Sequence, residues 1–300
     1  MSRSDPNFLH IPVLLEKSID FLNIHSDGIY VDCTAGGGGH SAEILKRLTT
    51  GRLICFELDR NIVAKAKNRL SAISDNYMFF EKSYIELKEV LEKEGIIGKI
   101  DGILFDLGIS SFQTEAGYGM SFNIDEPLDM RFSSVSSRDL PRFLNSAGQQ
   151  EIEQVLQEYG EERNFRKISA AIVKRRANEP ILTTFQLKQA VFSAFSKREP
   201  YGRVKQAVRR VFQALRIYAN DELANVESGI KQALEVLKPG GRLAVISYHS
   251  LEDRIVKRIF RENALNKGLK VITKKPIIPN GKEQKQNRRS RSAKLRIIEK

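Results

Sequence analysis

Hydrophobic and polar positions follow two different periods along the first 115 residues. Short apolar runs rich in β-branched and aromatic residues are typical of strands, and between them apolar residues recur at helical spacing. The expected strands cover residues 28–33, 52–57, 77–81 and 101–107, and the expected helices cover 13–22, 40–48, 61–70 and 85–93. Strands that alternate with helices of about ten residues predict βαβ units and a parallel sheet.

The alternation stops near Gln113, and the pattern that follows is helical. Residues 115–136 are rich in Gly, Ser and Asp and predict a long loop, whereas 138–178 carry only helical periodicity. Thr183 with Gln186 forms a capping box that opens a further helix over 185–196. A run of helices inside a βα alternation predicts an inserted, all-helical subdomain.

The alternating pattern resumes in the last part of the chain. We expect helices over 221–237 and 251–263, and strands over 242–247, 269–272 and 295–298, with a polar, basic linker before the last strand. The expected organisation is therefore an α/β, Rossmann-like domain in two parts, residues 1–114 and 216–300, interrupted by a helical insertion over 115–215.

Composition excludes several classes of protein. The chain is 41% hydrophobic and 29% charged, which is ordinary for a globular protein, and no apolar run approaches the roughly 20 residues of a membrane helix. Its first residues lack the pattern of a signal peptide. Cys33 and Cys55 are too few for a zinc cluster. We expect a cytoplasmic protein with free, buried thiols and no metal site.

The net charge of +12 is distributed unevenly. Residues 1–160 hold 16 basic and 24 acidic side chains, residues 161–216 hold 14 and 4, and residues 267–300 hold 12 and 2. Two blocks of net +10 beside an acidic front half favour a surface for a polyanion such as nucleic acid. Solvated helix faces and a basic tail would produce the same counts. Within the first block, Lys174, Arg175 and Arg176 are candidate phosphate contacts.

A glycine-rich segment joins the first expected strand to the next helix. It runs Asp32-Cys-Thr-Ala-Gly-Gly-Gly-Gly-His40, and Glu57 lies 21 residues beyond Gly36, at the end of the second strand. An acid about 20 residues beyond such a loop binds ribose hydroxyls in nucleotide-binding folds. The spacing favours a cofactor that contains a nucleoside, although a purely structural glycine turn would share the first feature.

The details of the loop narrow the choice of cofactor. The dinucleotide fingerprint G-x-G-x-x-G would need glycine where Ser41 stands, and no lysine follows the loop to make a P-loop. An NAD-dependent oxidoreductase is therefore disfavoured. The pattern D-x-x-x-G-x-G-G from Asp32, with Glu57 after the second strand, resembles S-adenosylmethionine-dependent methyltransferases. So does the turn Lys-Pro-Gly-Gly-Arg-Leu at 238–243.

Seven longer motifs make the resemblance specific. They are HIPVLL from His10, GGGGHS, DGILFDLGISS with Gln113 behind it, PLDMRF, YGEER, FQALRI and SYHSLEDR. In this order the motifs resemble the family of bacterial ribosomal RNA small-subunit methyltransferases H, also called MraW, from residue 10 to 298. The resemblance implies a Rossmann-like domain interrupted by a helical one, and S-adenosylmethionine as cofactor. It further implies methylation of the exocyclic N(4) of a cytidine in the decoding centre of 16S ribosomal RNA.

The resemblance also implies which residues contact the cofactor. Carried over position by position, they are Gly38, Gly39, His40, Glu57, Tyr84, Asp106 and Gln113. Glu57 stands where the family more often has Asp, and Tyr84 where Phe is common. Both replacements keep the chemistry, which is a carboxylate for the ribose and an aromatic ring beside adenine.

Two residues are candidates for catalysis. Asp106 ends the fourth strand, where many amino methyltransferases have Asp/Asn-Pro-Pro-aromatic, and is the leading candidate to accept the N–H bonds of the target amino group. An Asp at a strand end is also a common cap. His249 follows the strand at 242–247 and is a candidate to accept the released proton or to orient the base. Alternatively this histidine is structural, with Ser250 capping the next helix and Asp253 at its third position.

Two questions stay open at the level of sequence. A degenerate methyltransferase fold that binds ribosomal particles as a non-catalytic assembly factor would share the overall pattern. The intact glycine loop with Glu57, Asp106 and Gln113 argues against it, because a pure binder does not need a cofactor pocket. The partner is expected to be 16S ribosomal RNA in the small subunit, and the chain itself can be a monomer or a homodimer.

Overall fold

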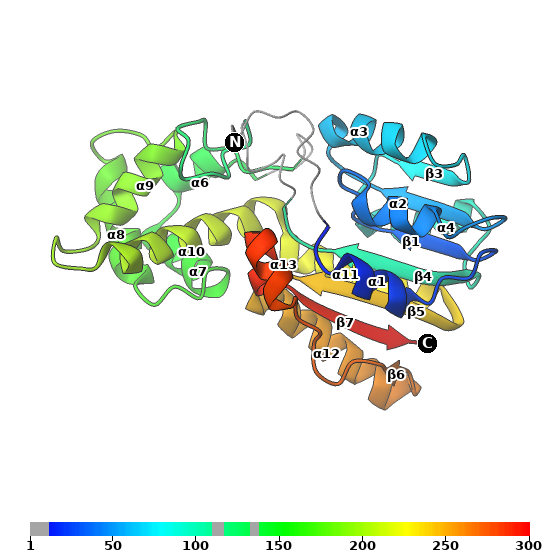
Figure 1. The fold of residues 1–300 in the computed structure, drawn as a ribbon. Helices are drawn as coiled ribbons and strands as arrows, with labels where there is room; N and C mark the ends of the chain where they lie inside the picture. Colours follow the sequence, from blue (N-terminus) through cyan, green and yellow to red (C-terminus); the bar gives the residue numbers. More distant parts are fainter. Residues whose placement is uncertain (1–11, 110–116, 133–137) are drawn as a thin grey trace. The chain divides into compact units, whose positions relative to one another are not determined.

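The computed structural model describes residues 12–109, 117–132 and 138–300 of the chain. It divides into two compact units, Met1–Gly108 with Leu223–Lys300 and Ile109–Glu222 (Figure 1). The boundaries expected from the sequence, 114/115 and 215/216, therefore lie a few residues away from those of the compact units. The second boundary differs because the last helix of the insertion runs unbroken to Asn220.

The first unit is built on a seven-stranded sheet in the order β3-β2-β1-β4-β5-β7-β6. Its strands are β1 (Ile29–Asp32), β2 (Arg52–Phe56), β3 (Tyr77–Phe80), β4 (Ile100–Asp106), β5 (Leu237–Ser247), β6 (Lys270–Val271) and β7 (Lys294–Glu299). The first five strands pair in parallel, and β7 is antiparallel to both of its neighbours. The predicted α/β, Rossmann-like fold class is confirmed.

Helices cover both faces of this sheet because neighbouring residues of each strand point to opposite faces. Val31 and Ile103 pack in one core with α4 (Leu87–Lys93), α11 (Glu222–Val236) and α12 (Ser250–Lys267). Tyr30 and Leu104 pack in the other core. That core includes side chains of α1 (Leu15–Leu22), α2 (Gly39–Leu45) and α3 (Arg60–Ser71). The central parallel strands β1, β2 and β4 are buried along most of their length, as expected of a parallel sheet covered on both faces.

The strand β5 begins earlier than its sequence pattern predicts. Ile100 pairs with Leu237 and Gly102 with Arg242, so residues 238–241 bulge out of the ladder. Gly240 has φ +77° in this bulge, a conformation that favours glycine. The predicted turn is therefore present, but it lies inside the strand rather than before it.

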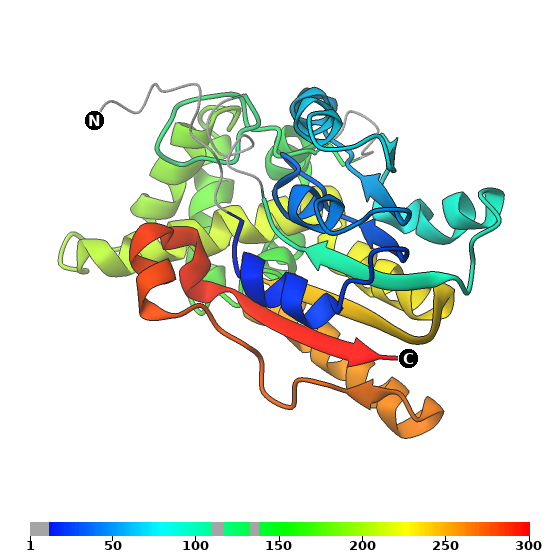
Figure 2. The ribbon, with the colours of Figure 1, turned by 45° about the vertical axis from the view of Figure 1, so that its right-hand side comes forward.

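The stretch predicted as a polar linker contains ordered secondary structure, so that prediction was wrong. It includes α13 (Gly281–Gln286) and the 3-10 helix η2 (Arg288–Ser292). The side chain of Asn280 caps α13, and Glu283 Oε1 accepts the backbone N–H of Leu14 at 2.7 Å. Figures 1 and 2 both show α13 beside the start of α1. The helix α13 has no apolar periodicity in its sequence and was therefore not predicted. Its contacts are instead a side-chain cap and one tertiary hydrogen bond.

The second unit is helical. Its helices among the described residues are α6 (Leu140–Ser146), α7 (Gln149–Glu158), α8 (Phe165–Arg176), α9 (Thr184–Ser193) and α10 (Tyr201–Asn220). The predicted capping box is confirmed, since Thr183 and Gln186 exchange side-chain and backbone hydrogen bonds at the start of α9. Each of these helices contributes to one apolar core. Neither α10 nor any other helix among the described residues is both long and apolar enough to cross a bilayer.

Candidate active site

Three acids lie at the carboxyl ends of adjacent parallel strands. Asp32 ends β1, Glu57 directly follows β2 and Asp106 ends β4. The register pairs Asp32 with Cys55 of β2 and with Leu104 of β4, so all three acids lie at one edge of the sheet. The strand order reverses between β1 and β4, and open α/β sheets bind their ligands at such a point.

The glycine loop between β1 and α2 is shaped by left-handed backbone and tied to β2. Gly36 has φ +51° and Gly38 has φ +76°, where an L side chain is strained. The backbone N–H of Ala35 donates to the carbonyl of Phe56, and that of Gly36 donates to Glu57 Oε2 at 2.8 Å. Gly39 has a different reason to be glycine, since a Cβ there would come 2.4 Å from Cγ of Pro12.

Glu57 is held by the backbone and keeps room for a ligand. Its Oε2 accepts from Gly36, and its Oε1 accepts from the backbone N–H of Asp59 at 2.8 Å. A carboxylate offers about four acceptor positions, so acceptor capacity remains for a hydroxyl group of a ligand. Burial raises the pKa of Glu57 to about 6, which leaves the group ionised at neutral pH. This geometry fits ribose recognition, the role expected from the spacing.

The residue that breaks the dinucleotide fingerprint has a structural task. Ser41 Oγ donates to Asp32 Oδ2 at 2.6 Å, and Oδ1 of the same carboxyl accepts the backbone N–H of Thr34 at 3.1 Å. Burial raises the pKa of Asp32. Asp32 and Ser41 therefore hold the start of the glycine loop to the first turn of α2.

Asp106 is the centre of a hydrogen-bonded cluster. Its backbone N–H donates to Thr34 Oγ1 at 2.6 Å, and the hydroxyl of Tyr248 donates to its Oδ1 at 2.7 Å. Its Oδ2 lies 3.6 Å from Nδ1 of His40. Burial raises the pKa of Asp106 to about 7, with a further rise from the charge of Glu252, and the Tyr248 hydrogen bond opposes both. The side chain is still 16% exposed, so a ligand can reach it.

Tyr248 is a functional candidate that the sequence analysis missed. Its ring lies against Gly108, where a Cβ would come 2.9 Å from Tyr248 Cδ2, so only glycine leaves this room. Its backbone N–H donates to Glu252 Oε2 at 2.7 Å. The signal was its position in SYHSLEDR, directly before the histidine that drew attention instead. The sequence around a tyrosine in a strand-to-helix turn does not indicate its hydrogen-bond partner, which here lies 142 residues away.

The side chain of His40 belongs to the Asp106 cluster. It is almost fully buried, and its Nε2 lies 3.1 Å from the carbonyl of Val13. Because a carbonyl only accepts, Nε2 carries a hydrogen and Nδ1 faces Asp106 as an acceptor when the ring is neutral. Burial lowers the pKa of His40 and favours the neutral ring. The predicted contact between His40 and the cofactor stays a prediction, and because the side chain is buried we expect the backbone to make it.

His249 caps α12. Its Nδ1 accepts the backbone N–H of Glu252 at 3.4 Å, and Glu252 Oε2 accepts the N–H of His249 at 3.2 Å. The suggestion that Ser250 is the cap was wrong, since Ser250 is the first helical residue. Asp253 instead bonds Arg296 of β7. Nε2 of His249 lies 3.1 Å from Glu252 Oε1 but forms no hydrogen bond with the described residues. The catalytic role of His249 stays a prediction.

Of the other predicted cofactor contacts, one can be placed and one cannot. Tyr84 opens the 3-10 helix η1 (Tyr84–Glu86) after β3, and its ring meets Phe105 edge-on at 5.3 Å between centroids. Gly229 makes room for it, because a Cβ there would come 2.7 Å from Tyr84 Cδ2. Gln113 lies outside the described residues.

The proposed phosphate contacts of α8 need correction. Arg176 donates to the carbonyl oxygens of Leu144 and Ala147 at 2.7 and 2.6 Å, so it closes the end of α6. Arg175 pairs with Glu179 at 2.8 Å. Lys174 alone is exposed and without an ion pair among the described residues. Arg176 therefore has a structural role at the end of α6. A count of charges in the sequence does not distinguish such an arginine from a cation on the surface.

A doubly wound sheet with a glycine turn after β1 and acids at the ends of β1, β2 and β4 fits the class of Rossmann-like, S-adenosylmethionine-dependent methyltransferases, to which the chain's family belongs. Comparison with known families identifies which one. The sequence profile of the MraW methylase family matches residues 7–300. The chain belongs to the MraW methylase family.

Individual relatives agree over almost their whole length. The chain is 42% identical over 309 residues to the ribosomal RNA small subunit methyltransferase H of Carboxydothermus hydrogenoformans, covering 98% of both chains. It is 42% identical over 312 residues to the protein of that name from Heliobacterium modesticaldum, covering 98% of this chain and 99% of the relative. The corresponding Mesoplasma florum protein is 41% identical over 312 residues, with 97% and 99% covered.

Proposed function

We propose that this protein transfers a methyl group from S-adenosylmethionine to the exocyclic N(4) of a cytidine in the decoding centre of 16S ribosomal RNA, in the cytoplasm. Its relatives are named for small-subunit ribosomal RNA. The observation that carries the chemistry is Asp106, a carboxylate with a pKa of about 7 at the ligand-binding edge of the sheet.

The residues at that edge fit the cofactor. Glu57 keeps acceptor capacity for a ribose hydroxyl, and Gly36 leaves open space, since a Cβ there would meet nothing closer than 3.8 Å. The cofactor, when bound, supplies an electrophilic methyl group on a sulfonium. Acids at the strand ends suit its positive charge.

The protein's own part is to prepare the amino group and remove its proton. The lone pair of the cytosine amino group is delocalised into the ring, and a carboxylate that accepts its N–H bonds localises the pair on nitrogen. Asp106 does this when ionised, and Tyr248 holds its Oδ1 so that Oδ2 keeps one orientation. A base works best when its pKa is close to the working pH. His40 Nδ1 faces Oδ2 at 3.6 Å, and because burial lowers the pKa of His40, the proton stays on Asp106 until solvent removes it.

The helical unit, residues 109–222, is assigned to RNA binding in this proposal. Block 161–216 carries 14 basic against 4 acidic residues, and block 267–300 of the first unit carries 12 against 2. Such clusters bind phosphates with a strong dependence on salt. Any homodimer is secondary to this activity, and light scattering of the purified protein distinguishes it from a monomer.

The test uses small ribosomal subunits and S-adenosylmethionine labelled in the methyl group. The wild type should transfer label to RNA, and nucleoside mass analysis should identify N(4)-methylcytidine. Asp106→Asn should lose most of the transfer even at saturating cofactor, with the cofactor affinity of the variant measured by calorimetry. Subunit binding without transfer by the wild type would make the protein a non-catalytic assembly factor, and label in another nucleoside would refute the cytidine.

A further inference from the structure

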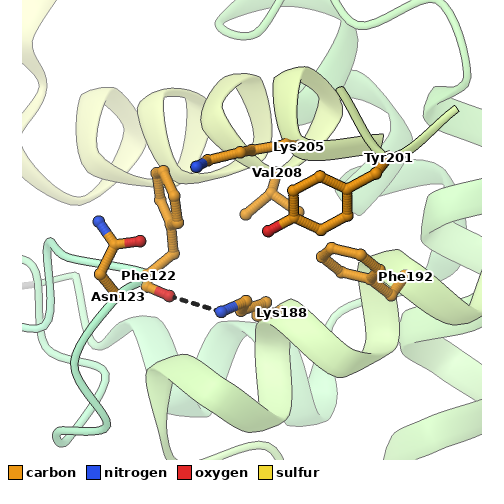
Figure 3. A pocket seen from close by; sticks show the side chains of 7 residues that line it. All are labelled: Phe122, Asn123, Lys188, Phe192, Tyr201, Lys205 and Val208. Atoms are coloured by element: carbon orange, nitrogen blue, oxygen red, sulfur yellow. Dashed lines mark hydrogen bonds between the residues drawn. The ribbon is translucent and has the colours of Figure 1, made fainter. Parts of the chain in front are cut away.

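A small pocket opens in the second unit, and none of the residues that line it belongs to the first unit. It lies between the loop at residues 122–123, helix α9 and the first turns of α10. Its walls are Phe122, Asn123, Lys188, Phe192, Tyr201 and Lys205, and the buried Val208 also lines it (Figure 3). None of these residues is acidic.

One aromatic ring of this pocket faces solvent, and two others, Phe122 and Phe192, are partly buried against the core of the unit. Tyr201 is 64% exposed, although it starts the longest helix of the unit. Its ring lies 6.0 Å from that of Phe192, tilted by 41°. Phe122 is held from the inside by Phe212, edge-on at 5.6 Å. Figure 3 shows the rings of Phe122 and Tyr201 on opposite sides of the opening. Flat, partly solvated rings at fixed positions are surfaces on which a planar group can stack.

Two ammonium groups flank the rings. Lys205 Nζ lies 5.9 Å from the centroid of Tyr201, and Lys188 Nζ donates to the carbonyl of Phe122 at 3.1 Å. An ammonium has three donors, so Lys188 has two left. Neither lysine forms an ion pair with any acid of the described residues. The pocket therefore combines stacking surfaces with uncompensated positive charge.

We propose that this pocket binds one unpaired nucleotide of the substrate RNA, with its base stacked on Tyr201 and an adjoining phosphate held by Lys188 and Lys205. Rings together with a basic rim are how proteins bind single-stranded nucleic acid without strict sequence preference. The nucleotide is not the one methylated, because the pocket lacks the carboxylate that the chemistry needs. The inference rests on the proposed function only for the identity of the RNA.

The first measurement is binding of a fluorescently labelled single-stranded RNA of about ten nucleotides, within the usual site size of such proteins. The full-length chain and its variants are compared by fluorescence anisotropy. Tyr201→Ala should weaken binding about tenfold, whereas Tyr201→Phe, which keeps the ring, should bind like the wild type. Because the Tyr201 side chain is mostly exposed, both variants should fold, and circular dichroism checks this.

The second measurement is the dependence of binding on salt. Lys205→Gln should reduce the slope of log affinity against log salt by about 0.7, the value for one phosphate of a single strand, and Lys205→Arg should not. A nucleoside monophosphate should compete with the RNA, whereas inorganic phosphate at the same concentration should compete less. Equal competition by phosphate would show a simple anion site, and stronger competition by an acidic peptide would indicate a protein partner. Either result overturns the proposal.

The two proposals fail separately. If folded Tyr201→Ala binds RNA like the wild type while the wild type methylates cytidine, the pocket inference is wrong and the proposed function stands. If the wild type transfers no methyl group but loses RNA affinity on Tyr201→Ala, the pocket stands and the proposed function is wrong.

Discussion

Removing one hydroxyl group should shift the pH at which this enzyme works. Tyr248 donates a hydrogen bond of 2.7 Å to Asp106, whose pKa is about 7. A hydrogen bond to the ionised form lowers a pKa, so Tyr248→Phe should raise it. Hydrogen bonds to charged groups contribute about 1.5–3 kcal/mol, and 1.36 kcal/mol corresponds to one pKa unit. The pKa of Asp106 should therefore rise by about one to two.

The assay is the pH dependence of kcat with saturating cofactor and small subunits. For the wild type, the rate should fall as the pH drops through about 7, because a protonated carboxyl cannot accept the N–H bonds of the amino group. For Tyr248→Phe the fall should begin about one to two pH units higher, with roughly tenfold loss at pH 7 and recovery at pH 9. Saturation removes the contribution of Glu57, whose protonation affects cofactor binding.

A matched variant controls for the loss of a hydroxyl elsewhere. Tyr77 lies in β3 of the same unit and donates to the carbonyl of Lys67, so Tyr77→Phe should leave the pH profile unchanged. The carbon-13 signal of the Asp106 carboxyl reports its pKa directly, without substrate. An unchanged profile in Tyr248→Phe, or an equal loss of rate at every pH, would refute the assignment of Asp106 as the group that titrates.

Three further predictions follow from individual contacts. Burial holds the pKa of Asp106 near 7, above about 3.9 in the unfolded chain, so folding stability is lost as the pH rises from about 4 to 7. Asp106→Asn should therefore raise the unfolding free energy at pH 8, by at most about 4 kcal/mol, and not at pH 4; denaturant titrations showing equal gain at both would contradict this. Glu57→Ala should weaken cofactor binding by about 1–3 kcal/mol, and Glu57→Asp much less; unchanged affinity by calorimetry would remove the ribose role. Arg176→Ala should lower stability by about 1–3 kcal/mol because two carbonyls lose their donor, whereas exposed Lys174→Ala should not. Loss of RNA affinity in folded Arg176→Ala would reinstate it as a phosphate contact.

The sequence alone determined the alternating, parallel part of the first unit and the location of its ligand edge. Strand and helix periods are local, and a parallel βαβ arrangement places all strand ends on one side. Glu57 and Asp106 could therefore be assigned to one edge without coordinates. The glycine loop could also be predicted from the sequence, because the left-handed backbone at Gly36 and Gly38 depends only on the residues at those positions.

Only the tertiary structure decided how that edge is tuned. Tyr248 reaches Asp106 across 142 residues of chain, through the pairing of β4 with β5 and the space left at Gly108. The raised pKa of Asp106 comes mainly from burial, a property of packing that no motif records. The same limit explains Arg176, whose carbonyl partners lie about 30 residues earlier in the chain. The local sequence determines which side chains stand at each strand end. Long-range packing determines their hydrogen-bond partners and their protonation, because it decides which groups lie beside each side chain and how far water is excluded from it.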